Sequence, residues 1–157
     1  MDIRIDNLEG KDIAEFLQQH INDMRSVSPP ESKHALDLEG LRAPDITFWS
    51  LYDGDQLVGC AALKELDVDH GEVKSMRVKA SVRGQGIGSK LVSHVVQEAM
   101  NRQYRSIALE TGSMPFFEPA RALYLKHGFS YCGPFGSYKE DPYSVFMELR
   151  LGAAGVN

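Results

Sequence analysis

The sequence has few of the features that mark secreted proteins or zinc-binding proteins. Its 157 residues include only two cysteines, Cys60 and Cys132, which lie far apart in the chain. Neither belongs to a group of paired Cys and His residues of the kind that binds zinc, and we expect no metal. This cysteine usage favours a reducing, cytoplasmic setting in which both thiols are buried rather than functional.

Long apolar runs and excess positive charge are also missing. No run approaches the roughly 18 apolar residues that a membrane-spanning helix needs. The first residues, MDIRID, are acidic and lack the apolar stretch of a signal peptide. The formal net charge is -5, whereas a nucleic-acid-binding protein would present a basic surface. We therefore expect neither a membrane nor a nucleic acid as partner.

What is present is the composition of an ordinary globular domain. Hydrophobic residues make up 43% of the chain and charged residues 25%, values typical of a protein with a buried core. The length fits one domain, which we place at residues 1–151. The last residues, 152–157, are expected to form a disordered tail.

Strands and helices alternate along the predicted domain. Alternating or β-branched apolar residues predict strands at 2–6, 46–52, 56–66, 72–78, 106–111, 129–132 and 144–151. Apolar residues at helical spacing predict a helix after Asp12 that ends at Ser28-Pro29-Pro30, and further helices at 31–41, 87–102 and 119–127. The strand, helix and strand of residues 72–111 predict a parallel βαβ unit.

A glycine-rich loop joins the first strand of this unit to its helix. Glycines alternate at 84, 86 and 88 within Val82-Arg83-Gly84-Gln85-Gly86-Ile87-Gly88-Ser89-Lys90. Glycine lets a backbone approach a ligand closely, and the N–H groups of a helix N-terminus favour an anion. Five cations lie nearby in sequence, namely Lys74, Arg77, Lys79, Arg83 and Lys90. The loop therefore predicts a phosphate or pyrophosphate cradle, with a turn required only for tight packing as the alternative.

The spacing excludes two better-known glycine motifs. A dinucleotide fingerprint requires G-x-G-x-x-G, and a P-loop requires a Gly-Lys pair five residues after its first glycine. Ser89 stands where each motif would need glycine.

Two segments together resemble the GNAT acetyltransferases. Arg83-Gly84-Gln85-Gly86-Ile87-Gly88 matches that family's R/Q-x-x-G-x-G/A signature, and Ala120 to Phe129 is similar to its A-x-x-L-Y-x-x-x-G-F segment. The order of elements resembles the family from about residue 2 to 151. One position departs from the pattern, because Phe117 stands where many members have Asn.

The resemblance implies a fold and a donor. The fold would be a mixed α/β (α+β) sheet of about six to seven strands flanked by about four helices. Acetyl-CoA would place its pyrophosphate on the amides of Arg83, Gly84, Gln85, Gly86, Ile87, Gly88 and Ser89. Its pantetheine arm would pair with the main chain of Met76 and Val78. Its acetyl group would lie where that strand and residues 107–111 splay apart.

The resemblance also implies which side chains act. Tyr124 would point at the cofactor sulfur. The alternative interpretation is that Tyr124 is an ordinary half-buried helix tyrosine. An amine must lose a proton to attack a thioester, so a carboxylate directly in reach or acting through water would assist. Glu72 is our candidate base and Glu110 its rival; a strand bulge would prevent alternation alone from deciding which one faces the cleft.

The acceptor is expected to be a small amine, bound by segments that border the cleft in the family. These are residues 26–41, 114–117 and 135–143, from which His34, Phe116 and Tyr138, together with Glu110, are the candidate contacts. Aromatic and charged side chains suit a small polar metabolite. The sequence thus predicts an acetyl-CoA-dependent N-acetyltransferase. A non-catalytic acyl-CoA-binding or sensing module is the alternative, and assembly as a homodimer stays open.

Overall fold

The computed structural model describes residues 1–27 and 38–151. Its elements alternate as the sequence predicts, and most bounds differ from the predicted ones by one or two residues. The strands are β1 (Asp2–Ile5), β2 (Ile46–Asp53), β3 (Gln56–Asp67), β4 (His70–Val78), β5 (Ser106–Gly112), β6 (Ser130–Cys132) and β7 (Ser144–Arg150). The α-helices are α1 (Lys11–Val27), α2 (Leu38–Leu41), α3 (Ile87–Asn101) and α4 (Glu118–Lys126), and two short 3₁₀ helices span Ala80–Val82 and Pro115–Phe117. Of the predicted helix at 31–41, residues 31–37 lie outside the described residues.

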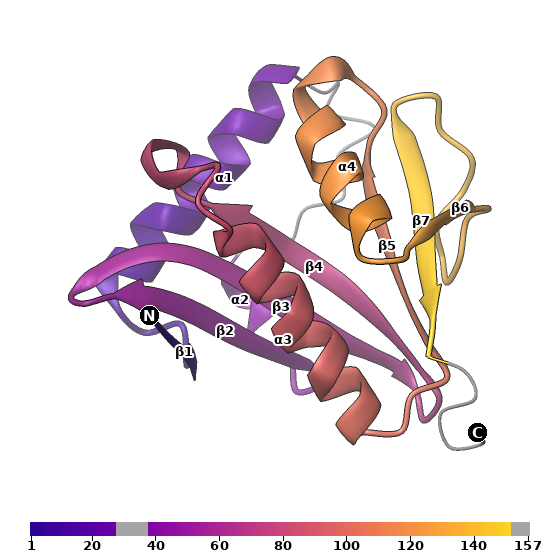
Figure 1. Cartoon of the computed structure of the whole chain (residues 1–157), viewed down its shortest axis with the longest axis horizontal. Coiled ribbons are helices and arrows are strands. Elements are labelled where there is room, and N and C mark those ends of the chain that lie inside the picture. The colour runs from indigo at the N-terminus through magenta and orange to yellow at the C-terminus, as the bar shows by residue number, and fades with distance from the viewer. Residues whose placement is uncertain (28–37, 152–157) are drawn as a thin grey trace.

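The described strands form one mixed sheet in the order β1-β2-β3-β4-β5-β7-β6 (Figure 1). Neighbouring strands run antiparallel except β4 and β5, which are parallel and connected through α3. The predicted mixed fold and the parallel unit are therefore both confirmed.

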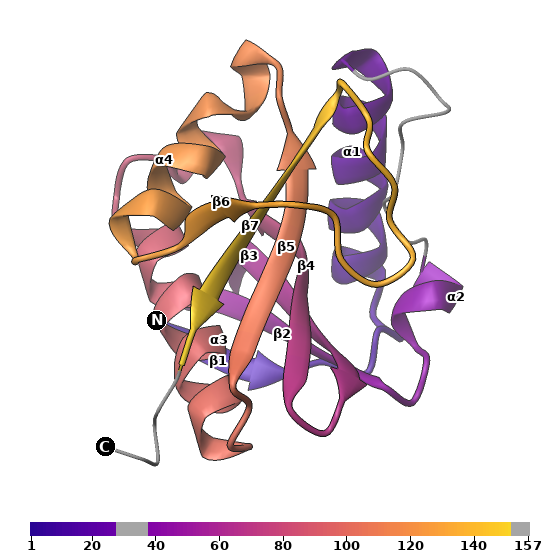
Figure 2. The same ribbon diagram turned by 90° about the vertical axis from the view of Figure 1, so that its right-hand side faces the viewer.

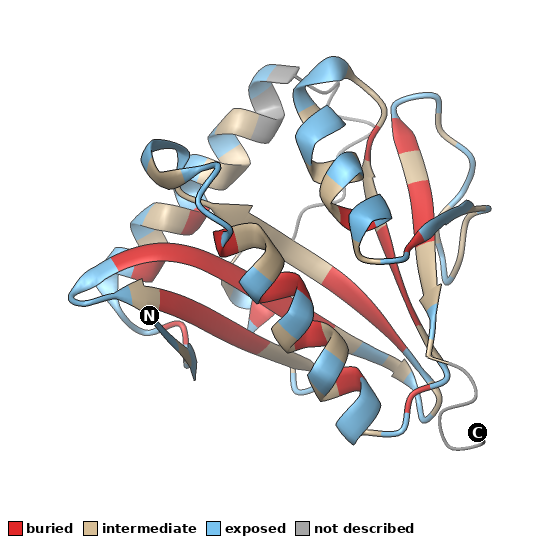
Figure 3. Ribbon diagram, in the orientation of Figure 1, coloured by how far each residue is buried: buried red, intermediate tan, exposed pale blue. Residues whose placement is uncertain are grey.

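Helices cover both faces of the sheet. In Figure 2, α1 and α2 lie on one side and α3 and α4 on the other. The core under α1 contains Ile13, Leu17 and Cys60, and the core under α3 contains Leu91, Val95 and Leu63. Figure 3 shows the buried residues concentrated on the central strands and on the helix sides that face them. Alternation along a strand therefore assigns each side chain to the α1 face or to the α3 face.

A bulge in β4 changes that alternation halfway along the strand. On β3, Cys60 pairs with Arg77, but Ala62 pairs with Lys74, so one extra residue lies between them on β4. Ser75 has a φ of 53° there, and its carbonyl accepts a hydrogen bond from the Cys60 thiol at 3.1 Å. Because Cys60 and Ala62 both lie on the α1 face, Lys74 and Arg77 face α1 as well.

The parallel strands β4 and β5 separate soon after they begin. Their pairing covers only His70 to Glu72 on β4 and Ser106 to Ala108 on β5. Beyond this point the two strands diverge (Figure 1), and the rest of β4 pairs with β3 alone. The predicted separation of the two parallel strands is therefore present, and the opening between them widens toward the glycine loop.

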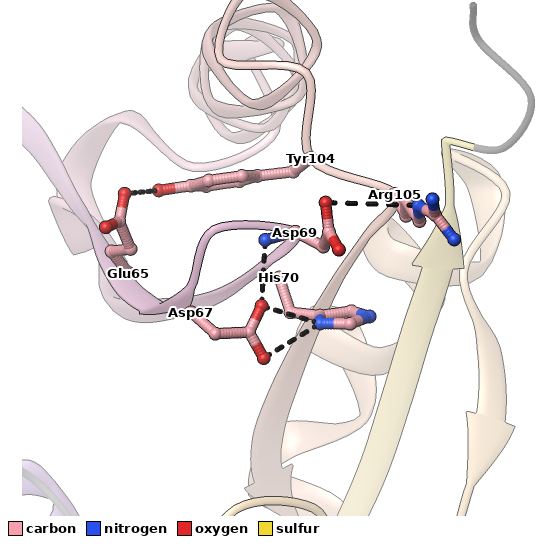
Figure 4. A network of polar contacts seen from close by, with 6 residues as sticks. All are labelled: Glu65, Asp67, Asp69, His70, Tyr104 and Arg105. Atoms are coloured by element: carbon pink, nitrogen blue, oxygen red, sulfur yellow. Dashed lines mark hydrogen bonds and ion pairs between the residues drawn. The ribbon is translucent and has the colours of Figure 1, made fainter.

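Polar contacts hold the closed end of the splay together (Figure 4). Asp67 accepts hydrogen bonds from the backbone N–H of Asp69 and contacts His70 Nδ1, both at 2.8 Å. The Arg105 backbone N–H donates to the Asp69 carbonyl at 2.6 Å, and the Tyr104 hydroxyl donates to Glu65 at 2.7 Å. The two Asp67 contacts lie within the β3–β4 turn, and the other two join this hairpin to the residues just before β5.

Candidate functional site

A cleft of about 540 Å³ occupies the opening between β4 and β5. Its lining comes from β4, the glycine loop, β5, the start and inner side of α4, the end of α1, and the loop between β6 and β7. Residues from opposite ends of the sequence therefore meet in one concave site. This is the arrangement expected of a binding site for a small ligand.

The glycine loop forms one end of the cleft. Gly84 and Gly86 have φ values of 84° and 82°, and a Cβ on either would meet no atom within 4 Å. These two glycines are thus required by backbone conformation, and the space above them is open. Gly88 differs, because a Cβ there would come within 2.9 Å of Leu123 Cδ2. Gly88 is therefore constrained by packing, as the alternative reading expects, whereas the phosphate cradle at Gly84 and Gly86 stays a prediction.

Most of the predicted loop residues do line the cleft. Arg83, Gly84, Gly86, Ile87, Gly88 and Ser89 are among its lining residues, whereas Gln85 is exposed and is not. The loop leads directly into α3, whose first residue is Ile87. The N-terminus of α3 therefore lies at the cleft, and the unpaired N–H groups of a helix N-terminus suit an anionic ligand.

The open edge of β4 forms the floor of the cleft. Met76 and Val78 line it, and both pack against the core under α3. In the described residues no strand pairs with this part of β4 on its β5 side. An extended ligand could therefore add to the edge as a further strand would.

Tyr124 reaches the cleft from α4. The residue is only 6% exposed, it lines the cleft, and its ring packs against Phe129 with centroids 5.4 Å apart. Burial raises the pKa of Tyr124 well above its ordinary value. The hydroxyl therefore keeps its proton at neutral pH and is suited to donating a hydrogen bond.

Glu72 lies in the cleft as part of a three-residue polar cluster. It is only 4% exposed, so it is not a solvent-facing acid at a strand end. Its Oε2 accepts hydrogen bonds from the Tyr138 hydroxyl at 2.6 Å and from Lys74 Nζ at 3.0 Å. Lys74 Nζ also donates to the Tyr138 hydroxyl at 3.1 Å. We call these residues, Glu72, Lys74 and Tyr138, the Glu72 cluster.

The pKa of Tyr138 is raised above its ordinary value. The main cause is burial, and the Glu72 and Glu110 carboxylates raise it further. Tyr138 is therefore a stable hydrogen-bond donor to Glu72. Its position in the β6–β7 loop brings this loop onto β4.

Glu110 faces the same side of the sheet as Glu72. The register pairs Glu72 with Ala108, two residues before Glu110, and both acids line the cleft. The Ser144 hydroxyl donates a hydrogen bond to Glu110 Oε2 at 2.7 Å. Both predicted acids are thus in the site, in different surroundings.

A second ion pair connects β4 to α1. Arg77 Nη2 contacts Asp23 Oδ2 at 2.5 Å, and Nη1 lies 3.4 Å from His20 Nδ1. Burial first, and then the Arg77 charge, lower the pKa of His20 to about 4, although Asp23 opposes the shift. His20 is therefore neutral at physiological pH.

These contacts correct one sequence prediction. The sequence places Lys74 and Arg77 among the cations near the phosphate cradle, yet in the structure both pair with carboxylates on the α1 face. Alternation along β4 could not reveal this, because the bulge at Ser75 moves Arg77 onto that face. Sequence reasoning also missed Asp23 and His20, which only the packing of α1 brings to β4.

The remaining candidates differ in how they are placed. Phe116 lines the cleft and is 45% exposed, while Phe117 packs against Gly112. His34 lies outside the described residues. Cys60 is buried, and burial raises the pKa of its thiol to about 12, but Cys132 is only half-buried, contrary to expectation.

The described residues contain neither a metal-binding cluster nor a helix that could span a membrane. Within residues 1–27 and 38–151, no group of three or more His, Cys, Asp or Glu side chains is arranged to hold a metal ion. Across the same described residues, no helix has the length and apolar character that crossing a membrane requires.

Comparison with known proteins gives the site a context. Residues 14–129 match the model of the acetyltransferase (GNAT) family. Over 151 residues the chain is 53% identical to YsnE of Bacillus subtilis, described as an uncharacterised N-acetyltransferase, covering 96% of this chain and 100% of that protein. It is 44% identical to YedL of Escherichia coli, with the same description, over 95% of this chain and 94% of YedL.

A solved structure shows the same fold. An aminoglycoside 6'-N-acetyltransferase complexed with coenzyme A superposes with a TM-score of 0.70. The match covers 96% of this chain and 97% of that one at 18% identity.

Proposed function

Because the chain belongs to the GNAT acetyltransferase family, we propose that it moves the acetyl group of acetyl-CoA to the amine of a small molecule by direct attack. One observation carries the proposal. The opening between β4 and β5 leads to the glycine loop at the N-terminus of α3, and Tyr124, Glu72 and Glu110 all line the same cleft. A site for the donor's phosphates thus adjoins groups that can assist acyl transfer.

The donor fits the residues at the loop end of the cleft. The amides from Arg83 to Ser89 would hold its pyrophosphate, because the open space above Gly84 and Gly86 leaves the backbone accessible. The unpaired edge at Met76 and Val78 would take the pantetheine arm. The aminoglycoside acetyltransferase that shares this fold has coenzyme A bound, which supports a coenzyme A ester as donor.

The reaction requires one proton transfer and one leaving group. The amine nitrogen bonds to the thioester carbonyl carbon, the carbon–sulfur bond breaks, and the sulfur leaves as the coenzyme A thiolate. Glu72 takes the proton that the attacking amine loses, directly or through a water molecule. The carboxylate is suited to this because Tyr138 and Lys74 bind only its Oε2, which holds the group in place.

Tyr124 stabilises the thiolate rather than acting as a strong acid. Burial raises the pKa of Tyr124, while a free thiol has a pKa near 8.5. Proton transfer from the tyrosine to the thiolate is therefore unfavourable, whereas hydrogen bonding favours the departing charge.

Thiol release tests the proposal against the alternative of a non-catalytic acyl-CoA-binding module. The purified chain is incubated with acetyl-CoA and a broad panel of small amines, and free coenzyme A thiol and the acetylated amine are both measured. We expect amine-dependent release of thiol in equal amount to product. Acetyl-CoA binding by calorimetry, without turnover on any amine, would support the sensing module instead.

A further inference from the structure

Two cations lie on the α1 side of the cleft, and the β4 bulge brings them there together. The side chains of Lys74 and Arg77 are only 10% and 9% exposed. Burying a charged side chain is costly, and replacing a buried ion pair by apolar residues is often neutral or stabilising. Cations at these positions therefore call for an explanation, either in the fold or in the function.

Arg77 has such an explanation in the fold. Its guanidinium contacts Asp23 and His20 on α1, and it lies 5.9 Å from the centroid of the Phe16 ring. All these partners belong to α1, so Arg77 fastens this helix to the sheet.

Lys74 is placed differently. Both of its partners, Glu72 and Tyr138, are themselves cleft-lining residues, and Lys74 lines the cleft beside them. An ammonium group has three N–H donors, and two are used by these partners. Within the described residues no further hydrogen bond engages Lys74, which leaves one donor for a ligand.

We propose that Lys74 binds a carboxylate on the acceptor, so that the preferred acceptors are amines that also carry a carboxylate, such as amino acids. This inference rests on the proposed acetyl transfer. In an α-amino acid a single carbon separates the amine from the carboxylate. The heads of Glu72 and Lys74 are 3.0 Å apart, so an amine beside Glu72 places that carboxylate within reach of Lys74.

The charges of the site agree with such an acceptor. The acceptor side of the cleft contains the Glu72 and Glu110 carboxylates together with the Lys74 ammonium. A molecule with one amine and one carboxylate complements both signs. An amine without a carboxylate would instead leave the third N–H donor of Lys74 without an acceptor in a largely buried position.

The test compares matched acceptors that differ in the carboxylate alone. α-, β- and γ-amino acids are each assayed against the corresponding amide, and kcat/KM is corrected for the fraction of neutral amine at the assay pH. A hydrogen bond between charged groups predicts a preference of about 10- to 100-fold for at least one amino acid over its amide. In Lys74→Met the ratio should fall to near one, and Lys74→Arg should recover part of it.

Lys64→Met is the matched control. Lys64 lies opposite Glu72 on β3, is half-buried and does not line the cleft. The Lys64→Met variant therefore removes a lysine charge close to Glu72 without changing the cleft. The ratio of kcat/KM for an amino acid to that for its amide should stay unchanged. Calorimetry of acetyl-CoA binding identifies any variant that is simply misfolded, and Lys74→Arg then carries the comparison.

Two results would overturn the inference while acetyl transfer stands. These are equal kcat/KM for every amino acid and its amide in the wild-type chain, or an undiminished preference in a Lys74→Met variant that binds acetyl-CoA. A wild-type chain that binds acetyl-CoA yet acetylates no amine would overturn the proposed function itself, and the inference with it.

Discussion

The Tyr138 hydroxyl donates a hydrogen bond of 2.6 Å to Glu72, although the two residues are 66 positions apart in the sequence. The bond connects the β6–β7 loop to β4 and fixes one oxygen of the carboxylate. Glu110 receives a comparable bond of 2.7 Å from Ser144 at the start of β7. Both acids are thus oriented in the cleft, and their roles have to be separated by experiment.

Glu72 is expected to set the acid limb of the pH–rate profile. Glu72→Gln keeps the size of the side chain and removes the base, so kcat/KM should fall by about 10²- to 10⁴-fold, and the acid limb should flatten. The measurement is the pH profile of kcat/KM, corrected for the fraction of neutral amine, for Glu72→Gln, Glu110→Gln and the wild type. Flattening in Glu110→Gln alone would show that the other carboxylate is the base.

Tyr124→Phe tests stabilisation of the leaving thiolate. The substitution keeps the ring that packs against Phe129 and removes only the hydroxyl. An interaction that forms in the transition state appears mainly in kcat, so kcat should fall by at least about tenfold while the Kd for acetyl-CoA stays the same. Equal turnover in the two proteins would assign Tyr124 a packing role only.

The sequence predicted local features of this protein well, because they depend on neighbouring residues. Helical spacing of Leu91, Val92 and Val95 defines α3, and the glycines at 84 and 86 adopt the positive φ that favours glycine. The mixed sheet and the opening between β4 and β5 followed from the order of elements and the family resemblance.

Features that depend on distant segments could not be predicted in the same way. The bulge at Ser75 is a departure from strand alternation that no neighbouring residue type requires. The bulge moves Arg77 to the α1 face, where it pairs with Asp23 and lies on the same side as Lys74. Strict alternation along the strand would not have predicted either relationship. The roles of Tyr124, Glu72 and the other site residues stay predictions.

Gly86→Val should abolish acetyl-CoA binding. Gly86 has a φ of 82°, and a side chain there would project into the open space at the loop. Gly54→Val is the matched control, because Gly54 also has a positive φ of 63° and open surroundings, but does not line the cleft. Calorimetry should show lost affinity for the first folded variant and normal affinity for the second; unchanged affinity in both would remove the loop from the donor site.

Gly112 and Phe117 should be energetically coupled. A Cβ on Gly112 would overlap the Phe117 ring, so Gly112→Ala should destabilise the protein by about 1–3 kcal/mol, as overpacking usually does. With Phe117→Ala as background, the added methyl should cost much less. Urea unfolding of the double-mutant cycle measures the coupling, with Gly133→Ala as control because its Cβ would meet no atom within 4 Å. Additive free energies would mean that the ring moves aside without cost.

His20 should make the stability of the protein depend on pH between about 4 and 6.5. Burial, and then the Arg77 charge, lower the pKa of His20 from 6.5 to about 4 in the folded chain. Between these values the unfolded chain binds a proton that the folded chain does not, so the free energy of unfolding decreases as the pH falls through this window. The slope from one proton is at most about 1.4 kcal/mol per pH unit.

A His20→Gln variant isolates this effect. The variant cannot bind the proton in either state, so the difference in unfolding free energy between wild type and variant should be constant above pH 7. Below about pH 6.5 the difference should shift steadily in favour of the variant. The pKa of Asp23 is also lowered, since hydrogen bonds from Arg77 and Gln19 outweigh the effect of burial. The ordinary pKa of Asp23 is 3.8, so Asp23 changes the free energy of unfolding mainly below the pH window assigned to His20. Chemical denaturation from pH 4 to 8 measures the difference, and parallel curves for the two proteins would show that His20 titrates alike in the folded and unfolded chains.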